Sequence, residues 1–399
     1  MDAASRPRRS TEMTRQQLQF RLASFYFVYF LMLGGFAPYF GLYLRKLGFS
    51  GVEIGTLLAL MPLARLFAPN AWAWIADHQG QRRPLVRLTT AAAALSCAGL
   101  LVARSFGWLF VVILVLNTFW CAALPLVEAT TMAHLKGRLG DYGRIRVWGS
   151  VSFVLSVAVL GQVLDLTGIL WLPTMLLGLF TLNALASWAL PVDQAPPHHE
   201  EHAPLGQVLR RPEVLALFGA CFLMALAHGP YNTFYSIQLV ENGYSKSWVG
   251  WLWAISVLAE VGVFLLMPRM MRRFSIPGII SFSLGCAVVR FLVIGWLPRN
   301  VALMVIAQTM HAATFGAHHA AALAAIHHFF RGRTQARGQA LYTSIGFGGG
   351  GALGGFVSGW LWEHAGPALT FTFGAGAALL ALLVVAGRLR PAGLGRAAA

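Results

Sequence analysis

The strongest constraint on this chain is a series of long apolar runs that leaves little sequence outside them. A run of about 20 mainly apolar residues is long enough to cross a hydrocarbon core about 30 Å thick. Hydrophobic residues make up 57% of the 399 positions and charged residues only 11%, whereas a soluble domain has about 25% charged residues. The sequence therefore predicts an integral membrane protein.

Twelve apolar runs are predicted to be transmembrane helices. They cover residues 19–44, 53–76, 84–104, 107–133, 145–164, 167–190, 213–238, 247–268, 277–297, 300–328, 339–362 and 367–387. The first run is too long for a signal-peptide core, so we expect it to be retained. Residues 191–212 are rich in proline and charge and divide the runs into six and six. The predicted fold is all-α, with six-helix halves at 1–190 and 213–399 joined by a cytoplasmic linker at 191–212.

Basic residues are unevenly distributed between the two sides that this topology creates. With the N-terminus inside, the tails and even-numbered loops hold 23 of the 30 Lys and Arg residues, and the outer loops and helix ends hold five. This count includes Arg144, in the loop before residues 145–164, and Arg146, at the start of that run. Such a bias predicts that both termini are cytoplasmic in a bacterial-type inner membrane. It also explains the net charge of +16 without nucleic acid as a partner.

An enzyme is disfavoured, and no metal or other cofactor is expected. The linker residues His198, His199, Glu200, Glu201 and His202 have metal-binding side chains, but a flexible tether offers no preorganised geometry. We find no convincing nucleophile elbow or nucleotide-binding loop elsewhere.

Four ionisable side chains lie inside the apolar runs: Arg65, Glu128, Glu260 and Arg290. A charge near the bilayer centre costs about 2.5–3.5 kcal/mol on insertion scales. Residues retained at that cost are expected to serve substrate binding, proton transfer or ion pairing. We predict two pairs, Arg65 with Glu128 in the first half and Glu260 with Arg290 in the second.

The first pair has two open interpretations. The Arg65 guanidinium stays protonated and offers paired N–H donors that suit a carboxylate. Arg65 either binds a substrate carboxylate or forms a structural ion pair with Glu128, and the two states could alternate. Glu128 is either a structural partner or a titrating acid.

The second pair is predicted to couple transport to protons. Glu260 is the only ionisable residue in the interior of its run, and a carboxyl that is neutral when protonated enters lipid depth most easily. Arg290 is its expected alternating partner, and a permanent structural pair is the other interpretation. His311 and His319 are expected to assist, because histidine titrates near neutral pH.

Aromatic and amide side chains are expected to line the substrate cavity and to suit an aromatic or amphipathic solute. Together with Arg65 and Glu128 they form the predicted substrate site: Tyr39, Trp120, His228, Tyr231, Asn232, Tyr235 and Gln308. A second feature, a glycine run from Gly346 to Gly359, predicts a face on which helices pack closely and slide.

The loop after the second run resembles a signature of the major facilitator superfamily, Gly-x-x-x-Asp-Arg-x-Gly-x-Arg-Arg. This chain reads AWIADHQGQRRP there, with Ala73 and His78 replacing the first Gly and the first Arg. The matching residues are expected to form a gating motif: Asp77, Gly80, Arg82 and Arg83. Physically, an acid at a helix end can pair with nearby Arg or cap a neighbouring helix and latch one conformation.

Seven segments resemble one branch of that superfamily, the proton symporters related to phenylpropionate and lactose permeases. They are LARLF at Arg65, LPLVEA at Glu128, DYGRIRVWGSVSF at 141–153, HGPYNTFY from His228, the stretch 243–260, CAVVRF at Arg290 and QTMHAATFGAHH from Gln308. The resemblance implies a monomeric symporter in which protons and a small organic acid, such as an arylpropionate, cross the lipid bilayer together. A proton-driven exporter and a sugar or nucleoside symporter are the alternatives, and a non-transporting membrane protein is the least favoured one.

Overall fold

The computed structural model describes residues 14–135, 138–192 and 206–389, and every regular element within these ranges is helical. The first part of the chain forms α1 (Arg15–Phe36), α2 (Phe40–Lys46), α3 (Gly51–Gln79), α4 (Arg83–Ala98), α5 (Phe106–Leu135), α6 (Leu139–Thr167) and α7 (Leu172–Ser187). Short 3₁₀ turns at Gly99–Leu101 and Ile169–Trp171 precede α5 and α7. The predicted histidine cluster of the linker lies outside the described residues.

The second part of the chain contains shorter and less regular helices. These are α8 (Gly206–Leu209), α9 (Pro212–Ala227), α10 (Gly229–Glu241), α11 (Lys246–Arg273), α12 (Ile276–Trp296), α13 (Val301–Thr309), α14 (His318–Phe329), α15 (Gln335–Tyr342), α16 (Gly351–His364) and α17 (Pro367–Arg388). Two π-helical pieces, η3 (Ala312–Ala317) and η5 (Thr343–Gly350), connect α13 to α14 and α15 to α16, and a 3₁₀ turn at Gly332–Thr334 precedes α15.

Ten helices in the described part of the chain are long and apolar enough to cross a membrane. Two of these spans combine a pair of helices, α1 with α2 and α9 with α10. The predicted runs at 300–328 and 339–362 are helical as well, but η3 and η5 interrupt them. The protein is therefore a multi-pass membrane protein, and the count of twelve crossings stays a prediction.

Local sequence signals explain where several helices begin. Thr14 and Ser50 form capping boxes with Gln17 and Glu53 at the starts of α1 and α3, which satisfies backbone N–H groups that lack an intrahelical acceptor. At the other end of α3, Gly80 caps the helix with φ of 67°, a left-handed conformation that glycine adopts readily. The predicted gating motif thus begins at a true helix end.

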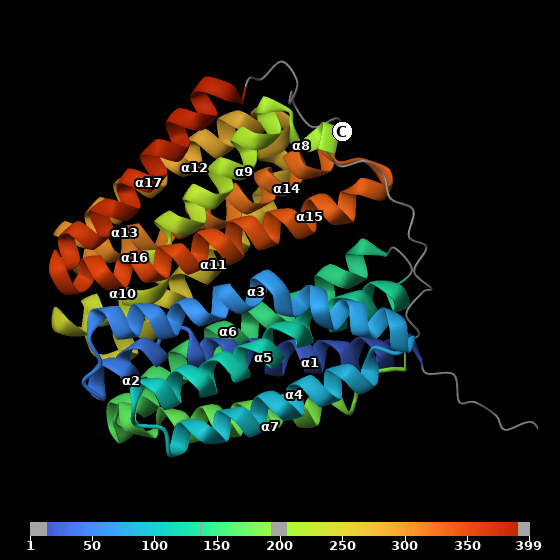
Figure 1. Ribbon diagram of the computed structural model, residues 1–399, viewed down its shortest axis with the longest axis horizontal. Coiled ribbons are helices and arrows are strands. Elements are labelled where there is room, and N and C mark those ends of the chain that lie inside the picture. Colours follow the sequence, from blue (N-terminus) through green and yellow to red (C-terminus); the bar gives the residue numbers. More distant parts are fainter. Residues whose placement is uncertain (1–13, 136–137, 193–205, 390–399) are drawn as a thin grey trace, which may run out of the picture.

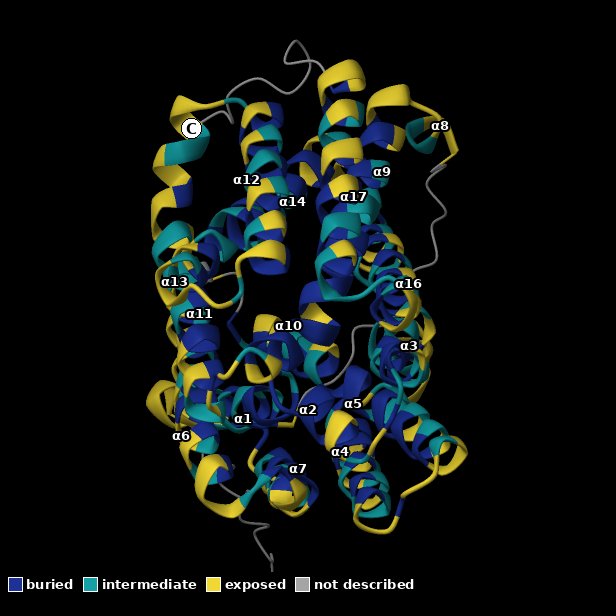
Figure 2. Cartoon of the chain, turned by 90° about the vertical axis from the view of Figure 1, so that its left-hand side faces the viewer, coloured by how far each residue is buried: buried dark blue, intermediate teal, exposed yellow. Residues whose placement is uncertain are grey.

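The helices pack as two groups that meet along two pairs of long helices. Figure 1 shows α1 to α7 in its lower part and α9 and α12 to α17 in its upper part. Within the first group, α1 packs on α6 and α7, and α5 packs on α3 and α4. Between the groups, α3 packs against α16 and α6 packs against α11. Figure 2 shows that the buried residues line the contacting faces and the exposed ones lie outside.

The contact between α3 and α16 depends on glycine. A Cβ atom built on Gly55 would lie 2.6 Å from the Gly359 Cα, and one on Gly359 would lie 2.7 Å from the Gly51 carbonyl oxygen. A real side chain at these positions would force the two backbones apart. The predicted close packing of the glycine run is confirmed, whereas sliding stays a prediction.

Two carboxylates join the groups at the end of the molecule where α3 and α11 begin. Asp165 near the end of α6 accepts hydrogen bonds from the backbone N–H groups of Lys246 and Ser247, each at 2.9 Å. Glu363 near the end of α16 accepts one from the Gly51 N–H at 2.6 Å. An acid at a helix N-terminus satisfies free N–H groups and opposes the helix dipole. Each carboxylate therefore ties one group to a helix start in the other.

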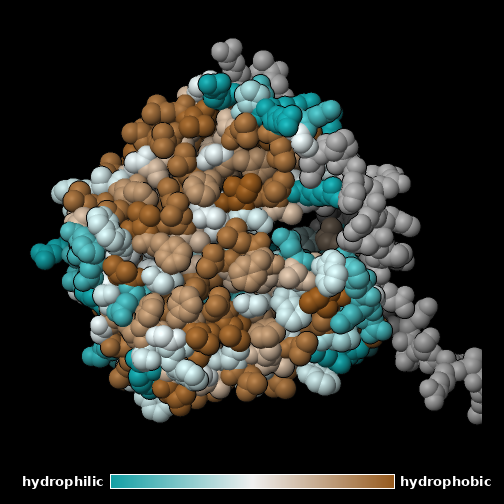
Figure 3. All heavy atoms as spheres, viewed as in Figure 1, coloured by the Kyte–Doolittle hydropathy of each residue, from teal (hydrophilic) through white to brown (hydrophobic). Residues whose placement is uncertain are grey.

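The surface agrees with a membrane environment. Figure 3 shows apolar side chains over the middle of the visible face and hydrophilic ones toward the left and right edges. Exposed large apolar side chains include Leu95, Leu166 and Leu265, which are 77%, 88% and 73% exposed. A soluble monomer rarely exposes so much contiguous apolar surface, and lipid contact accounts for it.

Candidate functional site

Arg65 and Glu128 do not form the predicted ion pair in the described part of the chain. The Arg65 guanidinium approaches the Met61 sulfur at 4.0 Å and interacts with Cys121. Arg65 lies 14 residues before the end of α3, and Cys121 lies 14 residues before the end of α5. Glu128 is seven residues further along α5, about 10 Å away at 1.5 Å per residue. The predicted pair is not formed in this conformation, because the two residues differ in depth.

Glu128 instead lies near Arg146 of α6. Its electrostatic neighbours are Arg146 and Tyr142, which are four residues apart and so share one face of α6. The Arg146 guanidinium also lies 4.1 Å from the Phe30 ring centroid. This environment supplies both a cation and an aromatic wall beside the acid.

Arg146 also interacts electrostatically with Glu260, the buried acid of the second group. The interaction crosses the interface where α6 packs against α11. One guanidinium is therefore electrostatically linked to an acid from each group. Arg146 was not predicted as a site residue because it lies at the edge of the apolar run 145–164 and was counted with the basic residues of the loop, whereas α6 begins earlier, at Leu139. Arg146 lies one turn after Tyr142 in the segment 141–153, which resembles the symporter branch. That position is the sequence signal that could have identified it.

Glu260 faces a histidine rather than an arginine within its own group. Its Oε2 atom lies 3.8 Å from His311 Nε2, and the two side chains are 17% and 12% exposed. The acid packs against the π-helical piece η3, where a Cβ on Gly316 would lie 3.0 Å from Glu260 Cγ. Glycine at 316 thus makes room for the carboxylate side chain. π-Helical pieces are frequent at functional sites.

Arg290 is fully buried and makes no ion pair with Glu260 among the described residues. Its Nε atom donates to the Ala307 carbonyl oxygen at 2.9 Å, and its Nη1 atom donates to Thr314 Oγ1 at 3.1 Å. The guanidinium also lies 4.2 Å from the Tyr231 ring centroid, a cation–π contact. The predicted Glu260–Arg290 pair is not formed in this conformation, because polar groups of α13 and η3 bind the arginine.

The Nη2 atom of Arg290 belongs to a set of buried polar atoms near α10. Tyr231 donates a hydrogen bond to Gln308 Oε1 at 3.0 Å, and its ring stacks on His311 with centroids 5.5 Å apart. Within the described ranges, the following buried atoms have no hydrogen-bond partner: Arg290 Nη2, Gln308 Nε2, His228 Nε2, His311 Nδ1 and the Tyr235 hydroxyl. A cluster of buried donors and acceptors without partners indicates a site where a ligand or water can form hydrogen bonds with them.

The structure brings His228, Tyr231, Tyr235 and Gln308 together, but it does not add Asn232 to them. His228 lies at the break between α9 and α10, and its Nδ1 atom is 2.8 Å from the Met224 carbonyl oxygen. Asn232 follows Tyr231 on α10 but is exposed, because neighbouring residues on a helix point about 100° apart. We call the clustered side chains, with Glu260, Arg290 and His311, the α10–α13 cluster.

Tyr39 and Trp120 lie in the first group, away from this cluster. The Tyr39 hydroxyl donates to the Val157 carbonyl oxygen at 2.5 Å, which anchors the chain between α1 and α2 on α6. Trp120 is 1% exposed and packs edge-on against Phe36 and Phe180 with centroids 5.1 and 5.2 Å apart. Both residues therefore contribute to packing in this conformation.

His319 and the gating motif occupy positions further along the helices. The His319 Nδ1 atom lies 2.8 Å from the Tyr342 hydroxyl, so this histidine connects α14 to α15. Asp77 is in the last turn of α3, and Arg82 is 8% exposed just before α4. Arg83 donates to the Trp188 carbonyl oxygen at 3.1 Å, which places a cation at the end of α7, where the helix dipole favours it.

Comparison with known proteins matches this helical membrane architecture to transporters. A family model described as "MFS_1 like family" matches residues 19–373. A probable 3-phenylpropionic acid transporter of Escherichia coli (strain K12) is 31% identical, covering 86% of this chain and 91% of that protein. The maltose permease of Geobacillus stearothermophilus is 25% identical, covering 92% of this chain and 95% of that protein.

Solved structures agree on the fold. The crystal structure of the nucleoside transporter NupG superimposes with a TM-score of 0.79 at 19% identity, covering 94% of this chain and 99% of that one. The class is thus a multi-pass membrane transporter for small molecules rather than an enzyme. Within that class, the chain belongs to the MFS_1 like family of the major facilitator superfamily.

Proposed function

We propose that this protein is a proton-coupled symporter of a small aromatic carboxylate, with 3-phenylpropionate as the first candidate. The observation that carries the proposal is Arg146, which interacts with Glu128 of the first group and Glu260 of the second. A guanidinium that attracts two acids can exchange one of them for a substrate carboxylate. The relative described as a 3-phenylpropionic acid transporter supports this substrate class.

The proposed architecture follows the sequence prediction. Twelve crossings form two six-helix halves at 1–190 and 213–399, with a cytoplasmic linker at 191–212, both termini in the cytoplasm and a monomer in the inner membrane. The two runs that contain π-helical pieces, Val301–Phe329 and Gln335–His364, supply the crossings beyond the ten spans of the described chain. The excess of Lys and Arg in the tails and even-numbered loops supports this orientation.

We propose that arginine side chains bind the carboxylate of the substrate and that aromatic side chains bind the ring of the substrate. Among residues 14–135, 138–192 and 206–389, Arg65 has no ion pair, so its charge is free to attract an anion. The aromatic part has neighbours in Tyr231 and Trp253, whose ring centroids are 5.1 Å apart. Stacking of this kind suits a phenyl group.

The proton is proposed to travel on Glu260. Protonation removes its attraction to Arg146, whereas ionisation restores it, so proton load changes the interaction between α6 and α11. Arg290 offers a further site for the ionised carboxylate after a conformational change, because its Nη2 atom has no partner in the described part of the chain. The equilibrium between conformations can then depend on the proton.

Alternating access requires the two groups to separate at one end and close at the other. In this conformation Asp165 and Glu363 bind helix starts across the interface, and the glycines of α3 and α16 are in contact. We propose that these contacts break when the groups open at that end. The Asp77–Arg83 motif is proposed to stabilise one conformation at the opposite end.

Uptake by purified protein tests the proposal directly. Proteoliposomes should accumulate labelled 3-phenylpropionate when the outside is more acidic than the inside, and a protonophore should abolish that accumulation. Protein-free liposomes control for diffusion of the protonated acid. Equal uptake with and without the gradient would contradict symport, and inhibition by maltose or a nucleoside but not by aromatic acids would contradict the substrate class.

A further inference from the structure

A groove on the outer side of the first group is separate from the charged residues of the proposed transport site. It has a volume of about 530 Å³ and lies between α1 and α6. Its α1 wall runs from Gln16 to Val28 with lining residues three or four positions apart, which places them on one helix face. Arg144 and Trp148 line the α6 wall.

The α6 wall faces away from the transport site. Arg144 and Arg146 are two residues apart, which turns them about 200° from each other around the helix. Arg146 faces Glu128 and Glu260, so Arg144 faces outward. Trp148 and Phe20 are 49% and 74% exposed. In a membrane-spanning helix pair, such an outward groove is open to lipid.

The groove has the length of one lipid leaflet. Twelve helical steps separate Gln16 from Val28, about 18 Å at 1.5 Å per residue. Half of a bilayer hydrocarbon core is about 15 Å, and a headgroup adds a few more. A small amphiphile would use only part of this length, whereas a phospholipid acyl chain with its phosphate would use all of it.

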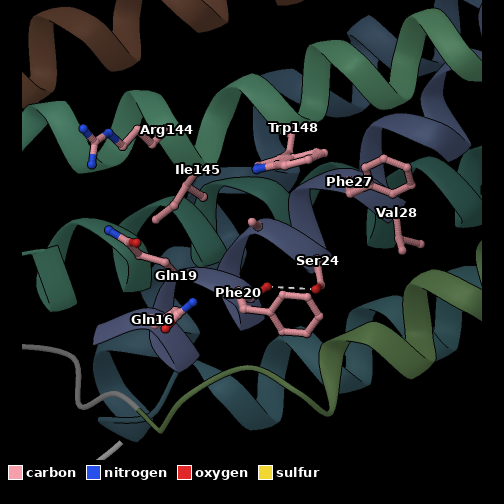
Figure 4. A pocket seen from close by; sticks show the side chains of 10 residues that line it. Gln16, Gln19, Phe20, Ser24, Phe27, Val28, Arg144, Ile145 and Trp148 are labelled. Carbon is pink, nitrogen blue, oxygen red and sulfur yellow. Dashed lines mark hydrogen bonds between the residues drawn. The ribbon is translucent and has the colours of Figure 1, made fainter. Parts of the chain in front are cut away.

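Polarity changes along the groove in the order that a phospholipid needs. Figure 4 shows Gln16, Gln19 and Arg144 toward one end and Phe27, Val28 and Trp148 toward the other. The polar end is at the start of α1, on the proposed cytoplasmic side. In the middle, the Ser24 hydroxyl donates to the Phe20 carbonyl oxygen at 2.8 Å, so it adds little polarity there.

The polar end carries a positive charge. Arg144 is the sole ionisable residue among those that line the groove in the described chain. The nearby acid, Asp141, is bound by Arg15 at 2.6 and 2.7 Å, and Arg138 lies 3.5 Å from it. Arg15 and Arg138 are the close partners of this acid, and Arg144 also attracts it. Arg144 is the cation that lines the groove itself.

We propose that this groove binds one anionic phospholipid, with the phosphate at Arg144, Gln16 and Gln19 and an acyl chain along Phe20, Phe27 and Val28. The inference rests on the proposed membrane orientation and is independent of the transported substrate. A basic residue near an anionic membrane surface is worth about 1 kcal/mol, which corresponds to about fivefold in affinity.

Native mass spectrometry of the full-length protein in detergent tests the site. The probes are palmitoyl-oleoyl phosphatidylglycerol and the phosphatidylcholine with the same chains. The wild-type protein should bind phosphatidylglycerol more tightly. Arg144→Gln should weaken that binding about fivefold and weaken phosphatidylcholine binding less, because the choline ammonium offsets the phosphate charge. Arg144→Lys should retain most of the preference. Ala23→Trp fills the groove and should reduce binding of both lipids.

A matched control is Arg272→Gln, an exposed arginine in the last turn of α11. It should bind both lipids as the wild type does, and excess inorganic phosphate should displace neither. Unchanged phosphatidylglycerol affinity in Arg144→Gln, or an equal loss in Arg272→Gln, would overturn the proposal. The proposal would also be overturned if the spectra showed a protein dimer and no lipid adducts, and if Ala23→Trp dissociated that dimer. If Ala23→Trp does not fold, the Arg144 variants are sufficient to test the site. Uptake into phosphatidylcholine vesicles tests the transport proposal separately.

Discussion

Glu128 and Glu260 both interact with Arg146, but their other neighbours differ. Glu128 has Tyr142 on the same helix face as the arginine, so its partners come from one rigid element. Glu260 has His311 at 3.8 Å and packs on the π-helical piece at Gly316. Its electrostatic interaction with Arg146 crosses the interface between the groups. An acid whose cation belongs to the other group can sense whether the groups are together, whereas Glu128 keeps its cation through a rigid-body movement.

The largest expected difference separates Glu260→Gln from Glu128→Gln. Glu260→Gln cannot carry a proton, so accumulation driven by the gradient should fall to equal concentrations inside and outside. Counterflow exchange, which needs no net proton movement, should continue. Glu128→Gln should still accumulate substrate, with a lower apparent KM, because it removes a carboxylate that competes with the substrate carboxylate for Arg146. Labelled uptake and counterflow measure both variants, and full accumulation by Glu260→Gln would remove it as the carrier.

Replacement of Arg146 should affect both acids at once. Arg146→Lys keeps the positive charge but loses the planar pair of donors. The apparent KM for 3-phenylpropionate should rise about tenfold, and accumulation should weaken. Arg272→Lys, which changes an exposed arginine of α11, is the matched control and should transport normally. An unchanged KM in Arg146→Lys would contradict the proposal that Arg146 binds the substrate carboxylate in exchange for one of the two acids.

Arg65 gives a smaller test of the first group. Because its guanidinium has no ion pair in the described ranges, Arg65→Lys should raise the KM for the carboxylate substrate about three- to tenfold. Inhibition by 3-phenylpropanol, which lacks the carboxylate, should not change. If both solutes are affected equally, Arg65 shapes the site without binding the carboxylate.

The smallest expected effect comes from the wall beside Glu260. In Gly316→Ala, the new methyl group would lie 3.0 Å from Glu260 Cγ and should shift the carboxylate away from His311. Overpacking of this kind costs stability, so we expect a modest loss of accumulation with counterflow retained. Gly285→Ala places its methyl group where nothing lies within 4 Å and serves as control. Equal behaviour of the two variants would argue against close packing at Glu260.

Much of the architecture was accessible from sequence because membrane crossing is a one-dimensional constraint. Apolar length alone located the helices, and the segments around Arg65, Glu128 and Glu260 identified the family that the comparisons confirm. The glycine run likewise predicted close packing, since spacing alone places small residues on one face. Helix irregularity was not visible in the same pattern, and the π-helical pieces η3 and η5 appeared only in the structure.

The pairing of charges was not predictable, because it depends on how deep each helix sits relative to its neighbours. Arg65 lies level with Cys121, two helical turns from Glu128. Arg290 uses the Ala307 carbonyl oxygen and Thr314, which come together at an irregular helix. Arg146 was counted with the basic residues of a loop because hydropathy places helix ends only within a few residues. Relative depth, local irregularity and helix ends are properties of the packed molecule.

The most direct test of the account is proton entry that accompanies substrate entry. Proteoliposomes loaded with a pH-sensitive dye and given an outward-to-inward gradient of 3-phenylpropionate should acidify inside faster than protein-free liposomes. Glu260→Gln should show only the protein-free rate while keeping counterflow exchange, and Glu128→Gln should still acidify. Wild-type transport without acidification, or full acidification by Glu260→Gln, would contradict the assignment of proton coupling to Glu260.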